Sequence, residues 1–446
     1  MQKYFIKTYG CQMNHSDSER IDLVLQNSGL EKSSLENANW VILNLCSVRQ
    51  TAIDRVWGKI HEITKKQKHT RLPARQENTK TKIILTGCIL ESDKKKFKDK
   101  VDYILDINDL PKWPFITKSL NHLSTKTQNY LYLPAGHASK FEAWVPIMTG
   151  CNNFCSYCVV PYTRGREKSR PADDILNEVN KLVVQGYKFI TLLGQNVNSY
   201  QSTDNKQQTT NNNKQEKINF PKLLKMIDRI PGDYWLSFVT SHPKDLSVEL
   251  IKCFKECKHL IPYLHLPIQS GSDQILKLMN RKYTAKKYLD LISQVRRLRP
   301  DIHLSTDVIV GFPNETKKDF EESMHIMKKV KYDMAYIAKY STRAGTAAAK
   351  YENNVSRAEK KQRDKKLNEI LKKTALENNK KMIGKTVEVL IEKKKDNAYF
   401  GKTRNFKNIK LTTNNQQLTT NNLMGKIVKV KVAKVTAWNL EGKIKD

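Results

Sequence analysis

Short apolar runs alternate with helix-like stretches in the first quarter of the chain. The runs KYFIKTYG, WVILNLC and KIILTGC are separated by amphipathic segments near residues 17–28 and 52–65. Strands that alternate with helices in this way are typical of a parallel, doubly wound sheet. The pattern therefore predicts an α/β domain over residues 1–120, interrupted by an exposed basic loop at 65–80.

The alternation resumes near residue 142 and continues through six further units. The strand candidates are WVPIMTG, KFITLLGQN, WLSFVTS, YLHLPIQ, HLSTDVIVG and MAYIAKYS. Helical stretches separate them at 172–185, 273–279, 285–298 and 317–329. Six βα units in one run predict an open six-stranded (βα)6 barrel, a partial relative of the eight-stranded form. We assign residues 137–372 to this central domain.

The last part of the chain changes character twice. A charged helix is predicted at about 356–381, with apolar residues too sparse for much burial. An all-β tail over 380–446 then offers TVEVLIEK, YFGKTRN, NIKLTT and KIVKVKVAKVTA, the last expected to bend into two strands. About five short strands predict a small β-barrel. Two polar tracts at 202–215 and 412–422 are predicted to be disordered insertions.

The composition narrows the class of partner and the location. The chain has 79 Lys and Arg against 45 Asp and Glu, a net charge of +34, which favours a polyanionic partner such as nucleic acid. Part of this excess reflects a general richness in Lys, Asn and Ile. No apolar run approaches the roughly 20 residues of a membrane helix, and MQKYFIKTYG has no signal-peptide layout. We expect a cytoplasmic protein with no membrane partner.

Three cysteines fall within eight residues in CNNFCSYC: Cys151, Cys155 and Cys158. They follow a predicted strand, which places them at the C-terminal mouth of the barrel, where active sites of such barrels lie. Three thiolates can hold a cubane iron–sulfur cluster by three irons and leave the fourth iron open. The alternatives are a zinc site completed by a distant ligand, and structural thiols.

Cys11, Cys46 and Cys88 each stand at or directly after an apolar run of the N-terminal domain. The carboxyl ends of parallel strands meet at one edge of a sheet, where such folds bind ligands. This shared position predicts a second three-cysteine cluster site. The alternative is that buried cysteines simply end three strands. Cys253 and Cys257 are interpreted as ordinary thiols of one helix.

Several segments resemble the radical S-adenosylmethionine methylthiotransferases. MTGCNNFCSYCVVPYTRGREKSRP is similar to the cluster motif of that family, and TYGCQMNHSDSER followed by Cys46 and Cys88 resembles its N-terminal domain. LGQNVNSY, SHP, HLPIQSGS and DVIVGFPNET occur in the family order, and the tail resembles its RNA-binding TRAM domain. The likeness spans nearly the whole chain. GCQMN and GQNVNSY point to the subgroup that acts on isopentenylated adenosine in tRNA.

The resemblance implies an enzyme that methylthiolates C2 of N6-isopentenyladenosine next to the anticodon. It implies two 4Fe–4S clusters and S-adenosyl-L-methionine as cofactors. The catalytic cluster on Cys151, Cys155 and Cys158 would bind S-adenosylmethionine and give a radical, while the auxiliary cluster would deliver sulfur. Further partners would be an electron donor such as flavodoxin or ferredoxin and a sulfur donor. We expect a monomer.

Five residues are candidates for contact with S-adenosylmethionine: Gln195, Gln269, Tyr157, Asn196 and Arg343. Four are polar residues near strand ends, of which the two glutamines are favoured, although any of them can equally satisfy backbone groups near the mouth. Tyr157 stands between the second and third cluster cysteines. By resemblance it packs against the bound adenine, and an ordinary packing role is the alternative.

The tail places basic residues beside aromatic ones. Lys402, Arg404 and Lys407 flank Tyr399, Phe400 and Phe406. Basic groups next to stacking surfaces suit RNA, with phosphates contacting the cations and unpaired bases the rings. The alternative is a solvated barrel face with core aromatics.

Two other functions compete with this interpretation. A sister enzyme would act on threonylcarbamoyladenosine in tRNA or on a ribosomal-protein aspartate, and GCQMN argues against it. A non-catalytic, metal-stabilised RNA-binding protein would use the six cysteines structurally. Its two sites would each lack the fourth ligand that structural zinc prefers.

Overall fold

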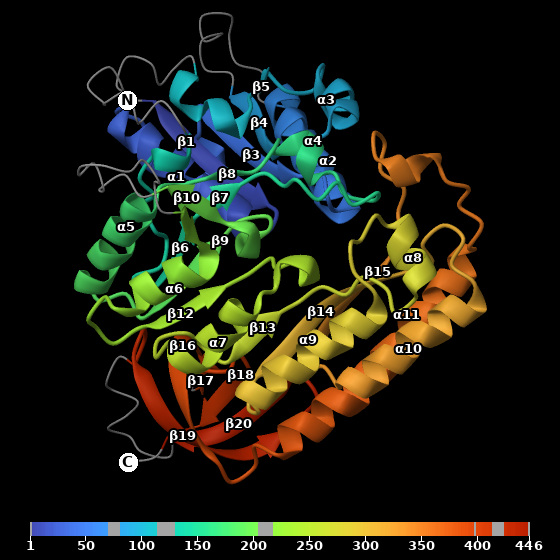
Figure 1. Cartoon of the computed structure of the whole chain (residues 1–446). Helices are drawn as coiled ribbons and strands as arrows, with labels where there is room; N and C mark the ends of the chain where they lie inside the picture. Colours follow the sequence, from blue (N-terminus) through green and yellow to red (C-terminus); the bar gives the residue numbers. More distant parts are fainter. Residues whose placement is uncertain are drawn as a thin grey trace, which may run out of the picture.

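A computed structural model describes residues 2–69, 81–113, 130–203, 217–396, 398–412 and 423–444. Most of the predicted insertions at 202–215 and 412–422, and most of the predicted basic loop at 65–80, lie outside the described residues. Three regions follow one another along the chain: an N-terminal sheet, a central barrel with its helices, and a small C-terminal barrel (Figure 1).

The N-terminal region is a five-stranded parallel sheet in the order β2-β1-β3-β4-β5. Its strands are β1 (Lys3–Tyr9), β2 (Glu31–Lys32), β3 (Trp40–Cys46), β4 (Lys82–Cys88) and β5 (Tyr103–Ile104). Its helices are α1 (Gln12–Asn27), α2 (Gln50–His69) and α3 (Glu91–Phe97). Ile42 of β3 packs with α1 on one face, while Val41 and Leu43 pack with α2 on the other. Strand alternation thus divides the sheet between two helical layers, and the predicted doubly wound domain is confirmed.

The central region has six parallel strands in two sets, β6-β9-β12 and β13-β14-β15, with a parallel bridge between Leu236 and Leu260 at the junction. The strands are β6 (Glu142–Pro146), β9 (Phe189–Leu193), β12 (Trp235–Phe238), β13 (Tyr263–His265), β14 (His303–Val310) and β15 (Met334–Lys339). All six match predicted runs. The open six-stranded barrel is confirmed.

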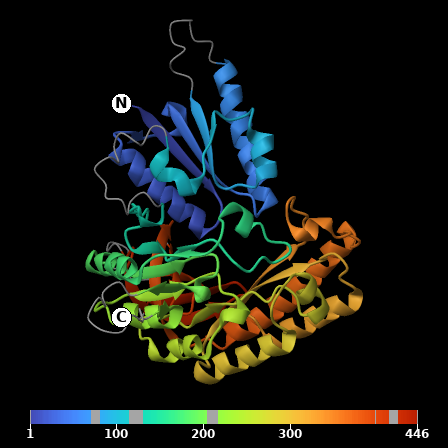
Figure 2. The same ribbon diagram turned by 45° about the horizontal axis from the view of Figure 1, so that its top comes forward.

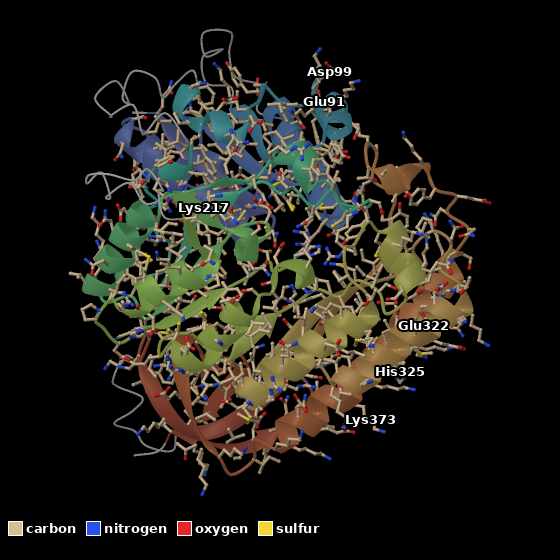
Figure 3. The ribbon with its side chains drawn as sticks, viewed as in Figure 1. Glu91, Asp99, Lys217, Glu322, His325 and Lys373 are labelled. Carbon is tan, nitrogen blue, oxygen red and sulfur yellow. The ribbon has the colours of Figure 1, made fainter. Side chains whose placement is uncertain are left out.

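Helices cover the outside of this barrel and bury their apolar faces against it. They are α5 (Ala172–Val184), α6 (Phe220–Asp228), α7 (Val248–Glu256), α8 (Asp273–Leu278), α9 (Ala285–Leu298) and α10 (Lys317–Val330). Short elements near the mouth are β7 (Met148–Thr149), α4 (Val160–Thr163), β8 (Lys168–Ser169), β10 (Gln201–Thr203) and β11 (Lys217–Asn219). The charged side chain of Lys373 lies on the outer surface, while Glu322 on α10 is half-buried (Figure 3). Among the described helices none is long and apolar enough to cross a membrane.

The charged helix α11 (Arg357–Lys380) forms where it was predicted, but it buries more than expected. Its inner stripe contains Lys360, Arg363, Leu367, Leu371 and Ala375, which recur every three or four residues. Arg363 pairs with the buried Glu315, and Lys360 Nζ donates to Asn353 Oδ1 over 2.6 Å. Because Lys360 and Arg363 are buried together with their partners, the buried stripe of α11 is longer than its apolar residues alone predict.

The C-terminal region is a closed five-stranded barrel in the order β16-β17-β18-β20-β19. Its strands are β16 (Thr386–Lys395), β17 (Ala398–Thr403), β18 (Asn408–Thr412), β19 (Ile427–Val435) and β20 (Asn439–Ile444). The expectation that 426–437 bends into two strands was wrong. β19 is a single strand whose pairing with β20 has one register shift, between Val432 and Lys434. The fifth strand of the barrel is β20, whose Leu440 and Gly442 are buried.

The two ends of the central barrel face different neighbours. In Figure 1 the N-terminal sheet lies above the central region and the C-terminal barrel below it, and Figure 2 again shows the N-terminal sheet at the top. The C-terminal barrel covers the amino ends of the central strands: Phe406 stacks on Tyr263, the first residue of β13, at 4.6 Å between ring centroids. Lys407 Nζ lies 2.7 Å from Asp333, just before β15. The carboxyl ends, which form the mouth, face the N-terminal sheet through contacts described below.

Candidate active site

The loop that carries Cys151, Cys155 and Cys158 runs from β7 to α4. Cys151 and Cys155 are each 8% exposed, and Cys158 is partly exposed. Gly150 makes the preceding turn with a φ of 79°, and a Cβ there would lie 2.1 Å from the carbonyl oxygen of Arg166. Only glycine fits this position without moving the backbone. The MTGC segment therefore brings the first thiol directly to the mouth.

Polar groups surround the three thiols. Arg281 Nη1 donates to Cys155 Sγ over 3.3 Å, and Asn153 Nδ2 donates to Cys151 Sγ over 3.5 Å. Burial raises the pKa of Cys151 and, more strongly, that of Cys158, to about 12. A bound cation reverses this effect, because thiolates are the form that binds metal. The donor set thus fits a cluster held by three thiolates.

Cys11, Cys46 and Cys88 converge at the carboxyl edge of the N-terminal sheet, as predicted. Cys46 and Cys88 are register partners on β3 and β4, and Cys11 directly follows β1 and caps α1. A hydrogen bond from Cys46 and the nearby guanidinium of Arg164 lower the pKa of Cys88 against the effect of burial. The same thiol pair and burial raise the pKa of Cys46, and burial raises that of Cys11.

Asn14 of the GCQMN segment links this second set of thiols. Its Oδ1 accepts from the backbone N–H of Cys11 at 3.3 Å, and its Nδ2 lies 3.9 Å from Cys88 Sγ. Nδ2 also donates to Asn44 Oδ1 over 2.9 Å. Gly87 precedes Cys88 with a φ of 107°, and a Cβ there would lie 2.4 Å from Asn44 Oδ1. Glycine at this position leaves room for the asparagine pair.

Arg164 follows the first thiol set in the chain, and its side chain contacts the second set. Its Nε donates to Cys88 Sγ over 2.9 Å, and its Nη2 lies 2.5 Å from Asp17 Oδ2. Tyr130 donates its hydroxyl to the same carboxylate. Sequence reasoning missed both Arg164 and Asp17. The signal available was their position inside the two cysteine segments, TRGR and HSDSER.

The number of thiols in each set bears on which metal it suits. Each set supplies three thiolates, the ligand number of a cubane cluster that leaves one iron open. Structural zinc sites prefer four ligands. The ligand count thus matches the cluster interpretation of the sequence.

The other predicted site residues lie near the mouth in varied roles. Gln195 Oε1 accepts from the backbone N–H of Gly150 at 2.6 Å, and the buried Asn196 donates to Asp245 over 2.8 Å. Gln269 follows β13 with a φ of 71° and pairs its backbone with β14. Tyr157 packs edge-on against Phe312, at 6.5 Å between ring centroids. This contact corresponds to the packing alternative for Tyr157.

Arg343 bridges two regions. Its Nη1 donates to Gln50 Oε1 at the start of α2 over 2.6 Å, so it joins the segment after β15 to the N-terminal domain. Cys253 and Cys257 lie buried in and just after α7 and hydrogen-bond each other. They belong to neither thiol set, as expected from the sequence.

Two of the basic residues singled out in the tail hold it to the central barrel. Lys407 pairs with Asp333, and Arg404 Nη2 donates to the carbonyl oxygen of Lys258 over 2.5 Å. Arg404 Nη1 also lies 3.3 Å from Glu388 Oε2 within the tail. Lys402 Nζ lies 4.4 Å from the ring centroid of Phe406. Their charges are thus partly neutralised by protein groups. Tyr399 is a core residue, as the alternative expected, but Lys407 lies in the interface with the central barrel and not on a solvated face.

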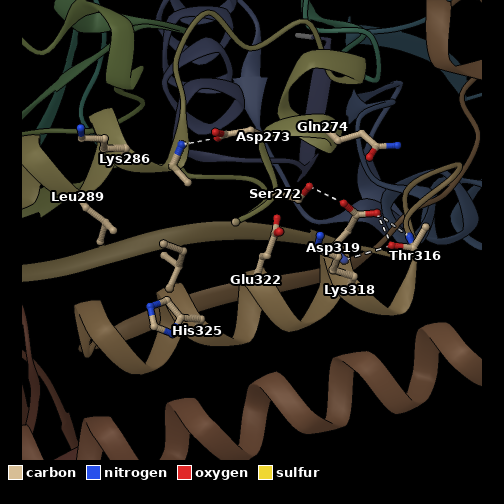
Figure 4. A pocket seen from close by; sticks show the side chains of 13 residues that line it. Ser272, Asp273, Gln274, Lys286, Leu289, Thr316, Lys318, Asp319, Glu322 and His325 are labelled. Atoms are coloured by element: carbon tan, nitrogen blue, oxygen red, sulfur yellow. Dashed lines mark hydrogen bonds between the residues drawn. The ribbon is translucent and has the colours of Figure 1, made fainter.

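Two cavities lie apart from the thiols of both sets. One of about 500 Å³ lies between α8, α9 and α10, where Ser272 and Thr316 hydrogen-bond Asp319 (Figure 4). None of its lining residues is a cysteine. A second of about 290 Å³ is lined by all three regions, including Gln12, Tyr336, Lys402 and Trp438. Tyr336 and Trp438 are 55% and 41% exposed and offer open aromatic surfaces.

Comparisons with known proteins define the class. The Radical SAM superfamily matches residues 145–327, the Uncharacterized protein family UPF0004 matches 3–106, and the TRAM domain matches 380–445. Among solved structures, the radical S-adenosylmethionine methyltransferase TsrM from Kitasatospora setae, with tryptophan substrate and a SAM analogue bound, aligns with a TM-score of 0.52. It is 12% identical and covers 76% of this chain and 73% of that chain. The central fold is thus that of a radical SAM protein.

Full-length relatives then give the family. A tRNA-2-methylthio-N(6)-dimethylallyladenosine synthase from Clostridium botulinum is 39% identical, covering 99% of this chain and 96% of that protein. Its counterpart from Thermoanaerobacter pseudethanolicus is 40% identical, covering 99% and 92%. The chain belongs to the family of tRNA-2-methylthio-N(6)-dimethylallyladenosine synthases. As a radical SAM enzyme it uses a 4Fe–4S cluster and S-adenosylmethionine.

Proposed function

We propose that this enzyme methylthiolates C2 of N6-isopentenyladenosine next to the anticodon of tRNA. The observation that carries the proposal is the contact of Arg164, just after the first thiol set, with Cys88 of the second set, in a chain similar over its full length to synthases named for this product. The domains that carry the function are residues 1–120, 137–372 and 380–446.

The first thiol set, Cys151, Cys155 and Cys158, would hold a 4Fe–4S cluster and leave one iron for S-adenosylmethionine. When bound, this pair supplies homolytic cleavage of an unactivated C–H bond, which no ordinary side chain achieves. The protein's own part is to hold the loop. Gln195 fixes the Gly150 amide, and the Arg281 guanidinium donates to Cys155.

The second set, Cys11, Cys46 and Cys88, would hold an auxiliary 4Fe–4S cluster from which sulfur reaches the substrate. Burial keeps Cys46 and Cys88 away from water, Cys11 is partly exposed, and Asn14 spans Cys11 and Cys88. Arg164 bonds Cys88 and lies in the chain just beyond the first set, so the two sites would face one space at the mouth of the barrel. This arrangement suits a reaction that needs a radical and a sulfur donor at the same carbon.

We assign direct contacts with S-adenosylmethionine to Gln195, Gln269, Asn196 and Arg343, four of the five sequence candidates. Gln269 is favoured because its left-handed backbone turns the chain at the strand end. Asn196 keeps a buried Oδ1 without a hydrogen-bond partner among the described residues, and a ligand donor would satisfy it. Tyr157 would act indirectly, by packing on Phe312 behind the loop.

The tRNA would approach through the cavity that the three regions share. Gln12, next to Cys11, lines one part of it, and Tyr336 and Trp438 line others. Exposed aromatic rings next to cations bind unpaired bases, which is how single-stranded RNA loops are recognised. The net charge of +34 favours association with the phosphate backbone.

The remaining partners follow from the chemistry. Reductive cleavage requires an electron donor such as flavodoxin or ferredoxin, and repeated turnover requires a sulfur donor. We propose that the enzyme acts as a monomer in the cytoplasm, where its tRNA substrate resides.

The direct test is nucleoside analysis of tRNA. Purified tRNA that carries isopentenyladenosine is incubated with the reconstituted protein, S-adenosylmethionine and a reductant, and the 2-methylthio product is measured by mass spectrometry. We expect product from the parent and none from Cys155→Ala or Cys46→Ala. Cys253→Ala removes a buried thiol outside both sets and should retain activity. Product formed only on threonylcarbamoyladenosine tRNA would refute the proposed substrate.

Iron content tests the two-cluster assignment separately. The anaerobically reconstituted parent should hold about eight irons, and the triple variant of Cys11, Cys46 and Cys88 to alanine about four. A colourless, zinc-containing parent would refute the radical mechanism.

A further inference from the structure

Arg164 follows the first thiol set in the chain, and its guanidinium contacts Cys88 of the second set. It stands at the end of α4, where its backbone N–H donates to the carbonyl oxygen of Val160 over 2.8 Å. Its side chain crosses to the N-terminal domain and meets Asp17 of α1 and Cys88 of β4. The arginine is 4% exposed and Asp17 is fully buried.

Its orientation is fixed by the fork of the guanidinium. The Nη2 end faces the Asp17 carboxylate, which also accepts from the Tyr130 hydroxyl, so the Nε–H is left to point at Cys88 Sγ. A planar fork can serve two partners at a fixed angle, whereas a lysine ammonium acts as a single point charge. The Nε–Sγ distance of 2.9 Å is short for a donor to sulfur.

We propose that Arg164 is a positioning residue that sets the reduction potential of the auxiliary cluster and makes it depend on domain docking. The inference rests on the proposed function, because it requires a cluster on Cys11, Cys46 and Cys88. Hydrogen bonds to ligating sulfurs tune the potential of iron–sulfur clusters. The N–H of a cationic guanidinium stabilises the reduced, more negative form of a cluster. A hydrogen bond from Arg164 therefore raises the reduction potential of the auxiliary cluster.

The docking dependence follows from the origin of the donor. Arg164 belongs to the central domain, while its partners Asp17 of α1 and Cys88 of β4 belong to the N-terminal domain. The hydrogen bond to Cys88 therefore exists only while the mouth of the barrel is covered by that sheet. Separation of the domains would remove it and lower the potential of the auxiliary cluster.

The test uses the full chain with Cys151, Cys155 and Cys158 changed to alanine, termed the single-cluster background. Its cluster is titrated with reductant and followed by electron paramagnetic resonance. Arg164→Met should lower the one-electron reduction constant by tenfold or more, equal to a shift of about 59 mV. Arg164→Lys keeps the charge but loses the fork, so it should shift the potential in the same direction by less.

A matched control separates tuning from simple stabilisation. Arg363→Met breaks another buried ion pair, to Glu315, which contacts no cysteine. It should lower the unfolding temperature and leave the potential of the single-cluster background unchanged. If Arg164→Met lowers only the unfolding temperature, the inference is overturned. If that variant does not fold, Arg164→Lys decides by the same titration. A single-cluster background without iron would instead overturn the proposed function itself.

Discussion

Asn14 Nδ2 donates a hydrogen bond to Asn44 Oδ1 over 2.9 Å, and Asn44 Nδ2 returns one to the Asn14 carbonyl oxygen over 2.8 Å. Both side chains are fully buried. This reciprocal pair joins the first turn of α1 to β3. Because Asn14 also contacts Cys11 and Cys88, the pair determines how two strand-end thiols lie relative to each other.

Asn14→Leu should therefore empty the auxiliary site. Leucine has a similar size but leaves the buried amide of Asn44 without its partner, which costs about 1–3 kcal/mol. We expect iron to fall from about eight to about four per chain. Asn379→Leu is the control, since Asn379 is equally buried and donates to Thr436 in the tail. It should lower stability without loss of iron. Full iron in Asn14→Leu would contradict the assigned role.

Gly150 and Gly165 offer a second matched pair. Both have positive φ, 79° and 76°, but a Cβ at Gly165 meets nothing within 4 Å, whereas one at Gly150 meets the Arg166 carbonyl. Alanine should cost about 1 kcal/mol of backbone strain at either position. Only Gly150→Ala should also displace Cys151 and remove about four irons. Thermal unfolding and iron analysis measure the two effects. Equal iron in both variants would show that the loop tolerates the clash.

The interface between the barrel and the tail should weaken at acid pH through His303. Burial lowers the pKa of His303 to about 4, opposed by Asp333 and aided by Lys407. The unfolded value is about 6.5, so below it the unfolded chain binds the extra proton. Stability should fall as pH drops from about 6.5 to about 4, by up to about 3 kcal/mol at 1.36 kcal/mol per pKa unit.

The measurement is the free energy of unfolding of the parent and His303→Asn at pH 7.5 and pH 5. The parent should lose more stability than the variant over this interval, because the variant has no imidazole to protonate. Asp301, Asp333 and Lys407 face the ring and remain in both proteins. Parallel losses would mean that other groups govern the acid response.

The sequence predicted the layers of this fold because the signals were local. The six strands of the central barrel are short apolar runs, and strand ends in a parallel sheet must share an edge. These two features predict that Cys11, Cys46 and Cys88 lie at the same edge of the N-terminal sheet. The Arg164–Asp17 pair, by contrast, could not be predicted, because 147 positions separate the partners and no periodicity relates them. β20 was missed because NLEGKI alternates weakly and uses a glycine inside the barrel.

Lys407 gives the last test, because sequence and structure assign it different roles. Its side chain is 9% exposed and pairs with Asp333 at 2.7 Å. Removing one member of a buried ion pair costs about 3–5 kcal/mol, so Lys407→Met should strongly destabilise the docked tail. Lys402→Met breaks the more exposed pair with Glu392 and should cost only about 0–1 kcal/mol.

tRNA binding distinguishes the two roles of Lys407. Each phosphate contact contributes about 0.7–0.9 to the slope of log affinity against log salt. Because the Asp333 carboxylate already neutralises Lys407, the slope for Lys407→Met should equal that of the parent wherever the variant is folded. The binding is measured by titration of tRNA at several salt concentrations. A slope reduced by about one would place Lys407 on the phosphate backbone, as its position between the tail aromatics first indicated.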